Sequence, residues 1–491
     1  MARGKKKEDL TLEKKLERAL VSVGEQPYEV PGNWCWTKLE AVCNGFQYGY
    51  TEKAVYEKVG PKYIRITDIG NGIINDKKAP YCPIDEKAYE AYKIHKDDIF
   101  IARMGSVGEN GLAFSDLDAV FASYLIRLIP KISAKYLSYY LQSGSYWGQI
   151  SEKSQGTTRL NVNANVLKRL MFPLPPLAEQ QRIVERIESL FAKLDEAKEK
   201  LEDSIGICNE RRNAILQKAF SGTLTEKWRR DHLNIKNCVI DNIEKYSLNL
   251  SKKEKKFIEN GQSKLKEITM SSNVCWYQGN VGAVSIVTNG STPSRKCDNF
   301  WNGDIPWVSS GEVRNNVIAY TEERITQEGY DNSSVKLLPI GTVLIAMIGE
   351  GKTRGQSAIL NIEATTNQNI AAIVVEHGQI NSKFLWYWLQ KQYKKNREKG
   401  AGSGPQALNC QRVRELDFII PPLEEQNEIV KIIDNLMNKE NFIIDLIETT
   451  LENIEGIRKS ILANAFRGEL GTNNPNEESA IELLKTMLIE S

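Results

Sequence analysis

A long segment of this chain occurs twice at a constant spacing, and this repeat limits what the chain can fold into. Residues 172–224 align without a gap with residues 418–470, at an offset of 246 positions. Both copies begin with Pro-Pro-Leu-x-Glu-Gln and end with Ala-Phe-x-Gly-x-Leu. A period of this length is too long for a solenoid. It predicts two copies of a unit built from a globular domain and a helix.

Each copy of the repeat reads as one long helix. Mostly apolar residues recur every three or four positions over 183–219 and 429–465, as along the seam of a coiled coil. Pro-Pro sets a stiff entry to the first turn, and Gly222 and Gly468 follow the last turn. Roughly forty residues of helix are about 60 Å long. Because neither helix can bury its seam alone, we expect the two to pair antiparallel; burial in each domain's own core, or in a homodimer, is the alternative.

Two regions of short strands and turns accompany these helices. The predicted fold class is α/β (α+β): two mixed α/β domains separated by two long helices that form an antiparallel coiled coil, a pseudo-two-fold internal repeat. The expected division is an N-terminal extension at 1–33, a first domain at 34–172, a first helix at 173–227, a polar linker at 228–273, a second domain at 274–418, a second helix at 419–470 and a C-terminal tail at 471–491.

Local patterns predict individual elements. Strands are expected at 62–67, 98–102 and 120–128, and helices at 12–21, 133–143, 252–267 and 382–390. Residues 307–309 and 341–346 stand where 65–67 and 97–102 stand in the first domain. The helices match closely while the domain loops differ. This contrast indicates two similar tasks with different targets.

Composition excludes several classes of protein. No apolar run is long enough to span a bilayer, and no apolar core follows the basic start of the chain as in a signal peptide. The eight cysteines form no CxxC pair and only three histidines occur, so zinc is not expected and reduced thiols in a cytoplasm are. A net charge of +2 favours no particular partner.

The duplicated Pro175-Pro-Leu-Ala-Glu-Gln and Pro421-Pro-Leu-Glu-Glu-Gln, with the two Ala-Phe-x-Gly-x-Leu ends, resemble the specificity (S) subunit of type I restriction–modification systems over nearly the whole chain. The resemblance implies two target-recognition domains, each reading half of a split, asymmetric double-stranded DNA site, and a phage-defence role. It also implies two modification subunits that methylate adenine with S-adenosylmethionine, and restriction subunits that use ATP and Mg. No cofactor is expected on this chain itself, and the N-terminal extension has no assigned role.

A helix pair of fixed length would act as a ruler that sets the distance between the two half-sites. On DNA this distance grows by about 3.4 Å per base pair. Polar side chains in glycine-flanked loops are the candidates for DNA contact, since Arg and Lys reach guanine and phosphate and Asn and Gln reach adenine. They are Lys77, Lys78, Arg103, Ser106, Asn110 and Arg159 in the first domain, and Ser291, Thr292, Ser294, Arg295, Lys296, Arg314, Lys352, Arg354 and Gln356 in the second. For each one, a solvated loop residue is the alternative. Tyr139, Tyr140, Trp386 and Trp388 are expected in the core rather than as stacking platforms.

Matched polar residues on the two helices are candidates for partner binding. They are Glu179, Gln180, Arg212, Glu425, Gln426 and Arg458. Because the repeats offer two equivalent surfaces, two modification subunits would dock on them. Helix capping and intramolecular ion pairs are the alternative role for each residue.

Enzymatic functions find little support in the sequence. Ala346-Met-Ile-Gly-Glu-Gly-Lys-Thr353 fits a loose phosphate-loop pattern, but the residues after it read as turn and strand instead of helix. A methyltransferase motif and a nuclease-like cluster are both missing from the sequence. The chain is therefore predicted to be non-catalytic. The remaining alternatives are a specificity subunit of another phage-defence methylation complex and a coiled-coil scaffold that binds proteins.

Overall fold

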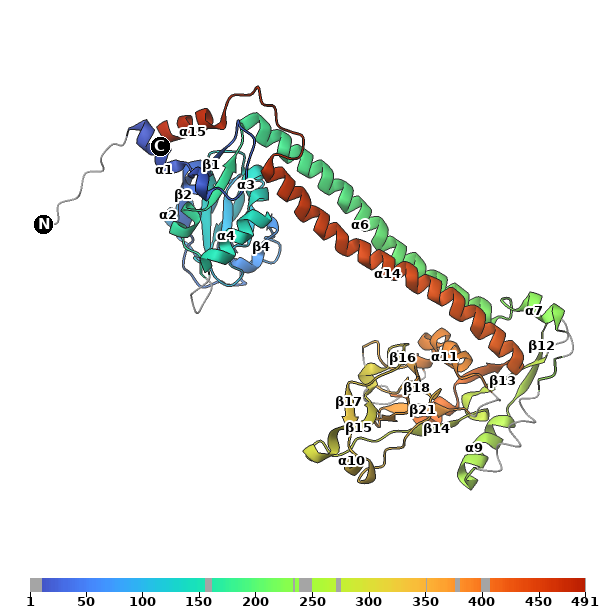
Figure 1. The fold of residues 1–491 in the computed structure, drawn as a ribbon. Helices are drawn as coiled ribbons and strands as arrows, with labels where there is room; N and C mark the ends of the chain where they lie inside the picture. Colours follow the sequence, from blue (N-terminus) through green and yellow to red (C-terminus); the bar gives the residue numbers. More distant parts are fainter. Residues whose placement is uncertain are drawn as a thin grey trace. The chain divides into compact units, whose positions relative to one another are not determined.

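The computed structural model (Figure 1) describes residues 11–154, 161–232, 235–237, 250–270, 275–349, 351–375, 380–398 and 407–490. The chain divides into two compact units. Unit 1 comprises Met1–Glu202 and Glu448–Ser491, and unit 2 comprises Asp203–Ile447. Each unit holds one mixed α/β domain and part of each long helix. None of the helices within the described ranges is long and apolar enough to cross a membrane.

The domain of unit 1 is built on a six-stranded sheet of order β2-β10-β7-β8-β5-β4. Its strands are β2 Cys43–Tyr48, β10 Leu125–Pro130, β7 Ile99–Ala102, β8 Asn110–Leu112, β5 Gly72–Ile74 and β4 Ile69–Gly70. A smaller sheet, β3-β9-β6, is made of β3 Lys62–Ile64, β9 Leu117–Phe121 and β6 Lys93–Ile94. The strands of β7 and β10 are almost wholly buried, and helix α3 Ala134–Tyr140 contacts β8. The sheet therefore presents a continuous apolar face to the domain core.

The main sheet of unit 2 repeats the order of five strands of the unit 1 sheet, whereas β4 has no counterpart and the smaller sheets differ in strand order. The strand order of this main sheet is β14-β21-β18-β19-β16, from β14 Ile286–Asn289, β21 Ile370–Val374, β18 Val343–Ala346, β19 Ser357–Leu360 and β16 Val317–Ile318. A second sheet consists of β17 Glu323–Ile325, β15 Trp301–Val308 and β20 Thr365–Thr366. Helix α11 Ser382–Lys391 corresponds to α3.

Backbone conformation confirms the equivalence of the two domains. Asn71 and Asn315 adopt φ values of 51° and 57°, and Asp97 and Gly341 adopt 69° and 86°. Both pairs lie 244 positions apart. Asparagine, aspartate and glycine are the residues that tolerate this left-handed region. The same turns therefore recur at the same places in the two sheets.

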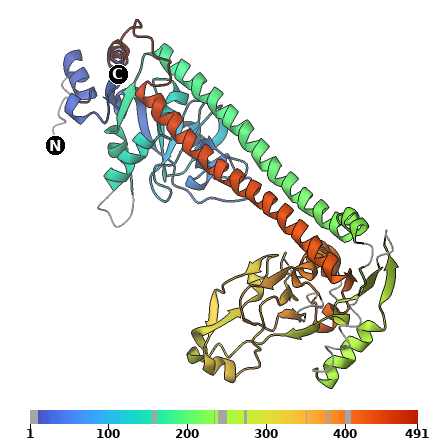
Figure 2. The same cartoon turned by 45° about the vertical axis from the view of Figure 1, so that its right-hand side comes forward.

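The long helices are α6 Leu177–Phe220 and α14 Leu423–Arg467, as predicted from the repeat (Figures 1 and 2). In unit 1 the first half of α6 lies beside the last part of α14, where Arg458 pairs with Asp195. In unit 2 the end of α6 lies beside the start of α14, where Arg211 pairs with Glu440 at 2.9 Å. The helices are therefore antiparallel in both units. Their ends also enter the domain cores, since Phe466 and Phe220 are buried with domain residues.

The first and last described segments of the chain both belong to unit 1. Helix α1 Leu12–Ala19 contacts helix α15 Ala480–Ile489, and Lys15 Nζ donates to the Leu488 carbonyl at 3.0 Å. In unit 2 the corresponding place is occupied by the linker, with α9 Lys252–Gln262 and β12 Lys266–Thr269. Helix α15 packs on the 3₁₀ turn Leu39–Val42, just as α9 packs on the 3₁₀ turn Val281–Ala283. The N-terminal extension and the C-terminal tail together thus do in unit 1 what the linker does in unit 2.

Several predicted elements differ in extent. The strand expected at 62–67 ends at Ile64 and continues as a 3₁₀ turn, and the run 120–128 is split by a turn into β9 and β10. The helix expected at 252–267 stops at Gln262, where β12 soon begins. Residues Arg65 and Ser309 cap equivalent 3₁₀ turns, so the pairing of 65–67 with 307–309 was wrong by two positions.

Helix junctions and candidate nucleic-acid interface

One glutamate at the head of each long helix is buried against a tryptophan from the neighbouring strand. Trp34 Nε1 donates to Glu179 at 2.7 Å, and Trp276 Nε1 donates to Glu425 at 2.8 Å. Both carboxylates have no exposed surface. Buried carboxylates require such partners, because a charge left without hydrogen bonds in the interior is costly. In each unit, the same hydrogen bond from a tryptophan to a glutamate therefore joins the domain to its long helix.

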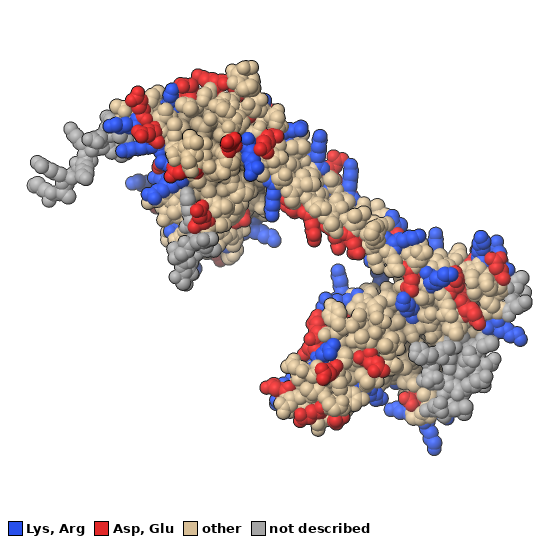
Figure 3. Space-filling model, in the orientation of Figure 1, with Lys and Arg blue, Asp and Glu red and all other residues tan. Residues whose placement is uncertain are grey.

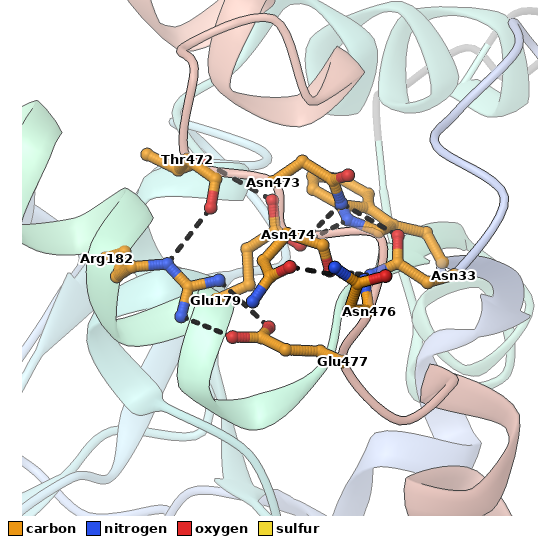
Figure 4. Close-up of polar contacts among 9 residues, drawn as sticks. Asn33, Glu179, Arg182, Thr472, Asn473, Asn474, Asn476 and Glu477 are labelled. Carbon is orange, nitrogen blue, oxygen red and sulfur yellow. Dashed lines mark hydrogen bonds and ion pairs between the residues drawn. The ribbon is translucent and has the colours of Figure 1, made fainter.

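The remaining partners of the two glutamates differ. Glu179 also accepts from Asn473 Nδ2 at 3.0 Å and Thr472 Oγ1 at 3.4 Å, both in the C-terminal tail (Figure 4). Arg182, one turn further along α6, binds the Thr472 carbonyl at 3.0 Å and Glu477 at 2.7 Å. The pKa of Glu477 is lowered by its hydrogen bonds with Arg182. The tail is thereby fixed to the head of α6.

In unit 2 a buried cation and one neutral hydroxyl bind the corresponding glutamate. Arg229, on helix α7 Glu226–Asp231, pairs with Glu425, and Thr225 Oγ1 donates to the same carboxylate at 2.6 Å. The Arg229 side chain is 2% exposed. The sequence pattern identified the two glutamates but missed Trp34, Trp276 and Arg229. The tryptophans could have been found from their positions. Trp34 directly precedes β1 Cys35–Lys38 and Trp276 is the second residue of β13 Cys275–Asn280, and these strands pair with the residues ahead of α6 and α14.

The neighbouring glutamines also play identical roles. Gln180 Oε1 accepts from the Ser133 backbone at 3.1 Å and its Nε2 donates to the Pro175 carbonyl at 3.0 Å. Gln426 does the same with Asn381 and Pro421, at 2.9 Å and 2.8 Å. All four side chains, Glu179, Gln180, Glu425 and Gln426, are buried and bound within their own unit. Their contacts are those of the capping alternative, and they offer no exposed surface to a partner.

The two matched arginines are placed differently. Arg458 pairs with Asp195 and lies over the Phe191 ring at 4.7 Å, with 23% of its side chain exposed. Arg212 is half-buried on α6 and lines a cavity of unit 2. Both remain accessible, so the partner-binding prediction rests on them.

The predicted DNA-contacting residues of unit 1 differ in exposure. Lys77, Lys78 and Ser106 are exposed on turns, as expected. Arg103 lies over the Tyr48 ring at 4.9 Å and is half-buried. Arg159 lies outside the described residues.

Asn110 requires a correction. It lies in strand β8 with 1% of its surface exposed, and its Nδ2 donates to the Leu141 carbonyl at 2.9 Å. The loop predicted from the glycines around it ends before this residue. Its side chain is thus part of the domain interior and does not face DNA.

In unit 2 most candidates are exposed or half-buried. Ser294, Lys296 and Lys352 are exposed, and Ser291, Thr292 and Gln356 are half-buried, with Thr292 Oγ1 donating to Gln368. Arg295 pairs with Glu323 and lies over the Trp301 ring at 3.7 Å. Arg314 is exposed, and its side chain donates to the Gly311 carbonyl.

Arg354 is the second correction. It is 7% exposed, and its carbonyl accepts a hydrogen bond from Arg397 at 3.2 Å. The turn that contains it leads into strand β19, as predicted from the sequence, and folds the arginine inward. Arg354 therefore supports the loop and does not present its guanidinium to solvent.

The aromatic residues at helical spacing are in the core, as predicted. Tyr140 packs on Phe172 and Phe466, with ring centroids 5.0 Å and 5.2 Å apart, and Trp388 packs on Phe220 at 5.1 Å. Trp386 is buried and Tyr139 is half-buried. On the face shown in Figure 3, acidic and basic side chains are mixed over both domains. This agrees with the net charge of +2.

Comparisons with known proteins agree with the duplicated architecture. The family model described as type I restriction modification DNA specificity domain matches residues 31–205 and again 273–455, together more than half of the chain. The specificity subunit of the type I restriction enzyme StySPI from Salmonella potsdam is 24% identical over 423 residues, which cover 83% of this chain and 82% of that protein. The EcoKI specificity subunit from Escherichia coli K12 is 25% identical over 441 residues, covering 87% and 88%.

Solved structures share the fold. A structure from work on complex assembly and conformational transition of the type I R-M system aligns with a TM-score of 0.63 at 18% identity, over 90% of this chain and all of that one. The HsdS subunit from Thermoanaerobacter tengcongensis aligns with a TM-score of 0.53 at 16% identity, over 91% of this chain and all of that one.

Proposed function

The chain belongs to the type I restriction–modification DNA specificity family, as a non-catalytic subunit that recognises DNA target sites, and we propose that it reads a bipartite, asymmetric DNA site. Target-recognition domains at 34–172 and 274–418 would each read one half-site. The observation that carries this proposal is the combination of the same Trp–Glu and Gln contacts at both helix heads with unlike loops. Equal scaffolds place the two domains in the same way on their helices, and unequal loops give each a different sequence to read.

The proposed complex contains two modification subunits and, for restriction, subunits that cleave and translocate DNA. S-adenosylmethionine would be held by the modification subunits, and ATP and Mg by the restriction subunits. The complex would act on double-stranded DNA in the cytoplasm. A protein partner is supported by apolar side chains left exposed on the long helices in unit 2: Ile207 is 51%, Phe442 is 69% and Leu446 is 57% exposed. Exposed apolar surface of this kind marks interaction sites.

Sequencing of genomic DNA with detection of methylated adenine tests the recognition of DNA. Cells carrying this chain and its modification subunit are compared with cells in which only this gene is deleted. We expect a split, asymmetric methylated motif that disappears on deletion. A methylation pattern that is unchanged, with the complex expressed, would contradict the proposal and favour the protein-binding scaffold.

Charge reversal on the long helices tests the partner surface. We expect Arg212→Glu combined with Arg458→Glu to weaken assembly with the modification subunit more than it lowers the melting temperature. The matched control is Lys193→Glu combined with Lys439→Glu, because these exposed lysines also correspond at the 246-residue offset. Equal assembly by both double variants, each normally folded by circular dichroism, would rule out the predicted surface.

A further inference from the structure

Each unit contains a cavity between its domain and the long helices, and corresponding residues line the two cavities. They measure about 480 Å³ in unit 1 and about 580 Å³ in unit 2. The left-handed Asn71 or Asn315 closes one side of the cavity. Lys135 and Tyr139 of α3, or Lys383 and Tyr387 of α11, line another side. The same cavity has thus been kept in two domains whose loops have diverged.

The polar contacts at the two cavities also correspond. Lys135 Nζ pairs with Glu188 at 2.7 Å in unit 1, and Lys383 Nζ pairs with Asp434 at 2.8 Å in unit 2. These acidic residues are related by the 246-residue offset of the repeat. Tyr387 donates to Asp434 at 2.6 Å, and burial raises the pKa of both tyrosines, that of Tyr139 to about 12. Both phenols therefore remain protonated donors at neutral pH.

The cavities differ at one arginine. In unit 1, Arg458 has its own carboxylate partner, Asp195. In unit 2 the corresponding arginine is Arg212, but the residue in place of the aspartate is Asn441. The neighbouring carboxylate of Glu440 is held by Arg211, through hydrogen bonds of 3.0 Å, 3.1 Å and 2.9 Å. Arg212 Nε is buried and has no hydrogen-bond partner among the described residues.

Two more buried donors line the unit 2 cavity without an acceptor in the described part of the chain. They are Trp386 Nε1, on a side chain only 7% exposed, and Gln390 Nε2. A buried donor left unpaired costs about 1–3 kcal/mol. All three donors belong to side chains that line this one cavity, so an acceptor bound there is the candidate partner for them.

The chemistry of the cavity identifies the kind of acceptor. Arg212, Lys383 and Arg314 face a single acidic side chain, Asp434, so the balance favours an anion. The walls are also apolar, with Leu216 and Met437 inside and Val317 47% exposed at the rim. Apolar walls around a few polar groups are typical of protein–protein interfaces, so we assign the anion to an aspartate or glutamate within a protein segment. A cavity present twice fits a partner present in two copies.

We propose that each cavity receives the same segment of a modification subunit, and that in unit 2 an Asp or Glu side chain of this segment accepts hydrogen bonds from Arg212, Trp386 and Gln390. This inference rests on the proposed function for the identity of the partner. In unit 1 the segment binds beside an arginine that Asp195 already neutralises. The two copies of the partner are therefore held with different strength.

Exchanging one residue between the cavities tests the proposal. Asn441→Asp gives Arg212 an internal carboxylate and repels the incoming one. We expect the affinity for the modification subunit that binds at unit 2 to fall at least about tenfold. Native mass spectrometry of the full-length chain with its modification subunit should then show complexes with one copy. Asn435→Asp, an exposed residue of the same helix outside the cavity, is the matched control and should leave two copies bound.

Two further variants distinguish a bound carboxylate from water in the cavity. Asp195→Asn frees Arg458 and should not weaken binding of either copy. Trp386→Phe keeps an aromatic side chain but removes the N–H donor, and should weaken binding of the modification subunit at unit 2 several-fold. If water alone satisfies the three donors, both Asn441→Asp and Trp386→Phe will bind two copies with unchanged affinity, and the proposal is overturned.

Photocrosslinking identifies the occupant directly. With p-benzoylphenylalanine at Val317, we expect crosslinks to one peptide of the modification subunit, and that peptide should contain an acidic residue. Crosslinks to DNA would overturn the inference. Binding of the methylated motif by the purified chain alone is measured in parallel. If the wild-type chain does not bind the motif, the proposed function is contradicted. If Asn441→Asp binds the motif as wild type does, a change in subunit binding can be assigned to the cavity and not to DNA recognition.

Discussion

The two buried glutamates, Glu179 and Glu425, occupy corresponding positions in the repeat but lie in different electrostatic environments. Glu179 is satisfied by neutral donors from Trp34, Thr472 and Asn473, whereas Glu425 is paired with the buried Arg229. Removing an acceptor from neutral donors leaves dipoles unpaired, but removing it from a buried cation leaves a charge unpaired. The two junctions therefore have different sensitivities although their sequences match.

We expect Glu425→Ala to destabilise unit 2 by about 3–5 kcal/mol, because Arg229 loses its counter-ion. Glu179→Ala should cost unit 1 about 1–3 kcal/mol. Hydrogen exchange of the strands β13 and β1 measures the two effects separately. Adding Arg229→Met to Glu425→Ala should recover part of the loss, and a Glu179→Ala variant as unstable as Glu425→Ala would contradict this account.

A second expectation at the residue scale concerns DNA. Lys77 and Lys78 are exposed on a turn, so replacing both with Ala should weaken binding of all DNA sequences alike. The slope of log affinity against log salt should fall by about one for each phosphate that is no longer neutralised. Titration of the full-length chain with cognate and unrelated DNA at several salt concentrations measures this. Weakened binding of the cognate site alone would instead indicate base contacts.

Residue types alone could not separate exposed candidates from buried ones. Arg354 lies in a glycine-containing turn as Ser106 and Lys352 do, and Asn110 directly follows one, yet Asn110 and Arg354 are buried. The direction of a side chain beside a turn depends on the strand after that turn, and strand ends are poorly marked in the sequence. The role of Glu179 and Gln180 in capping was predictable as an alternative, because Pro-Pro placed them in the first helical turn.

At the scale of elements, the C-terminal tail is part of the fold of unit 1. Ala480, Leu484 and Met487 of α15 lie in the same core as Trp34 and Phe466. Asn33 binds Asn473 at 2.7 Å and Asn474 at 3.1 Å, and so links the tail to the N-terminal extension (Figure 4). The sequence predicted an amphipathic helix at 12–21 but gave no reason for it. The reason is α15, whose residues lie hundreds of positions further along the chain and leave no local signal.

Acid should loosen this tail. The pKa of Glu477 in the folded chain is lowered from 4.5 by its hydrogen bonds with Arg182, so the folded state binds this proton less readily than the unfolded state does. The stabilisation is present above pH 4.5 and is lost as the pH falls through the lowered value. We expect the protection factors of α15, which are exchange rates corrected for the intrinsic pH dependence, to fall over that range. In Glu477→Gln the protection should already be lower at about pH 7, and its change with pH should be smaller than in wild type.

At the scale of the whole molecule, the repeat fixed the architecture because it is long, constant in spacing and periodic. Helices α6 and α14 are 44 and 45 residues long, close to the length predicted. The domains were predictable as mixed α/β from their strand patterns, but one of the two strand correspondences between them was displaced by two positions. The gap length in DNA and the bases read were not predictable, since they depend on loop conformations for which the repeat carries no information.

If the helices set the spacing of the half-sites, their length should set the gap in the methylated motif. Inserting one heptad into both α6 and α14, at matched positions, preserves the seam and adds about 10 Å. We expect the gap to lengthen by about three base pairs, as measured by sequencing of methylated DNA. A heptad in only one helix offsets the seams and should abolish methylation. An unchanged gap with both heptads would show that the helices do not measure the spacing.

The equivalence of the linker to the joined chain ends has a consequence for the origin of the protein. In unit 1, α1 and α15 come from opposite ends of the chain and fill the place that one continuous segment fills in unit 2. A gene encoding a single domain and helix would already contain every part of the junction, with the tail of one copy completing the head of another. Tandem duplication would turn that pair of identical chains into one polypeptide, after which the loops of each half could mutate separately and a symmetric target could become an asymmetric one.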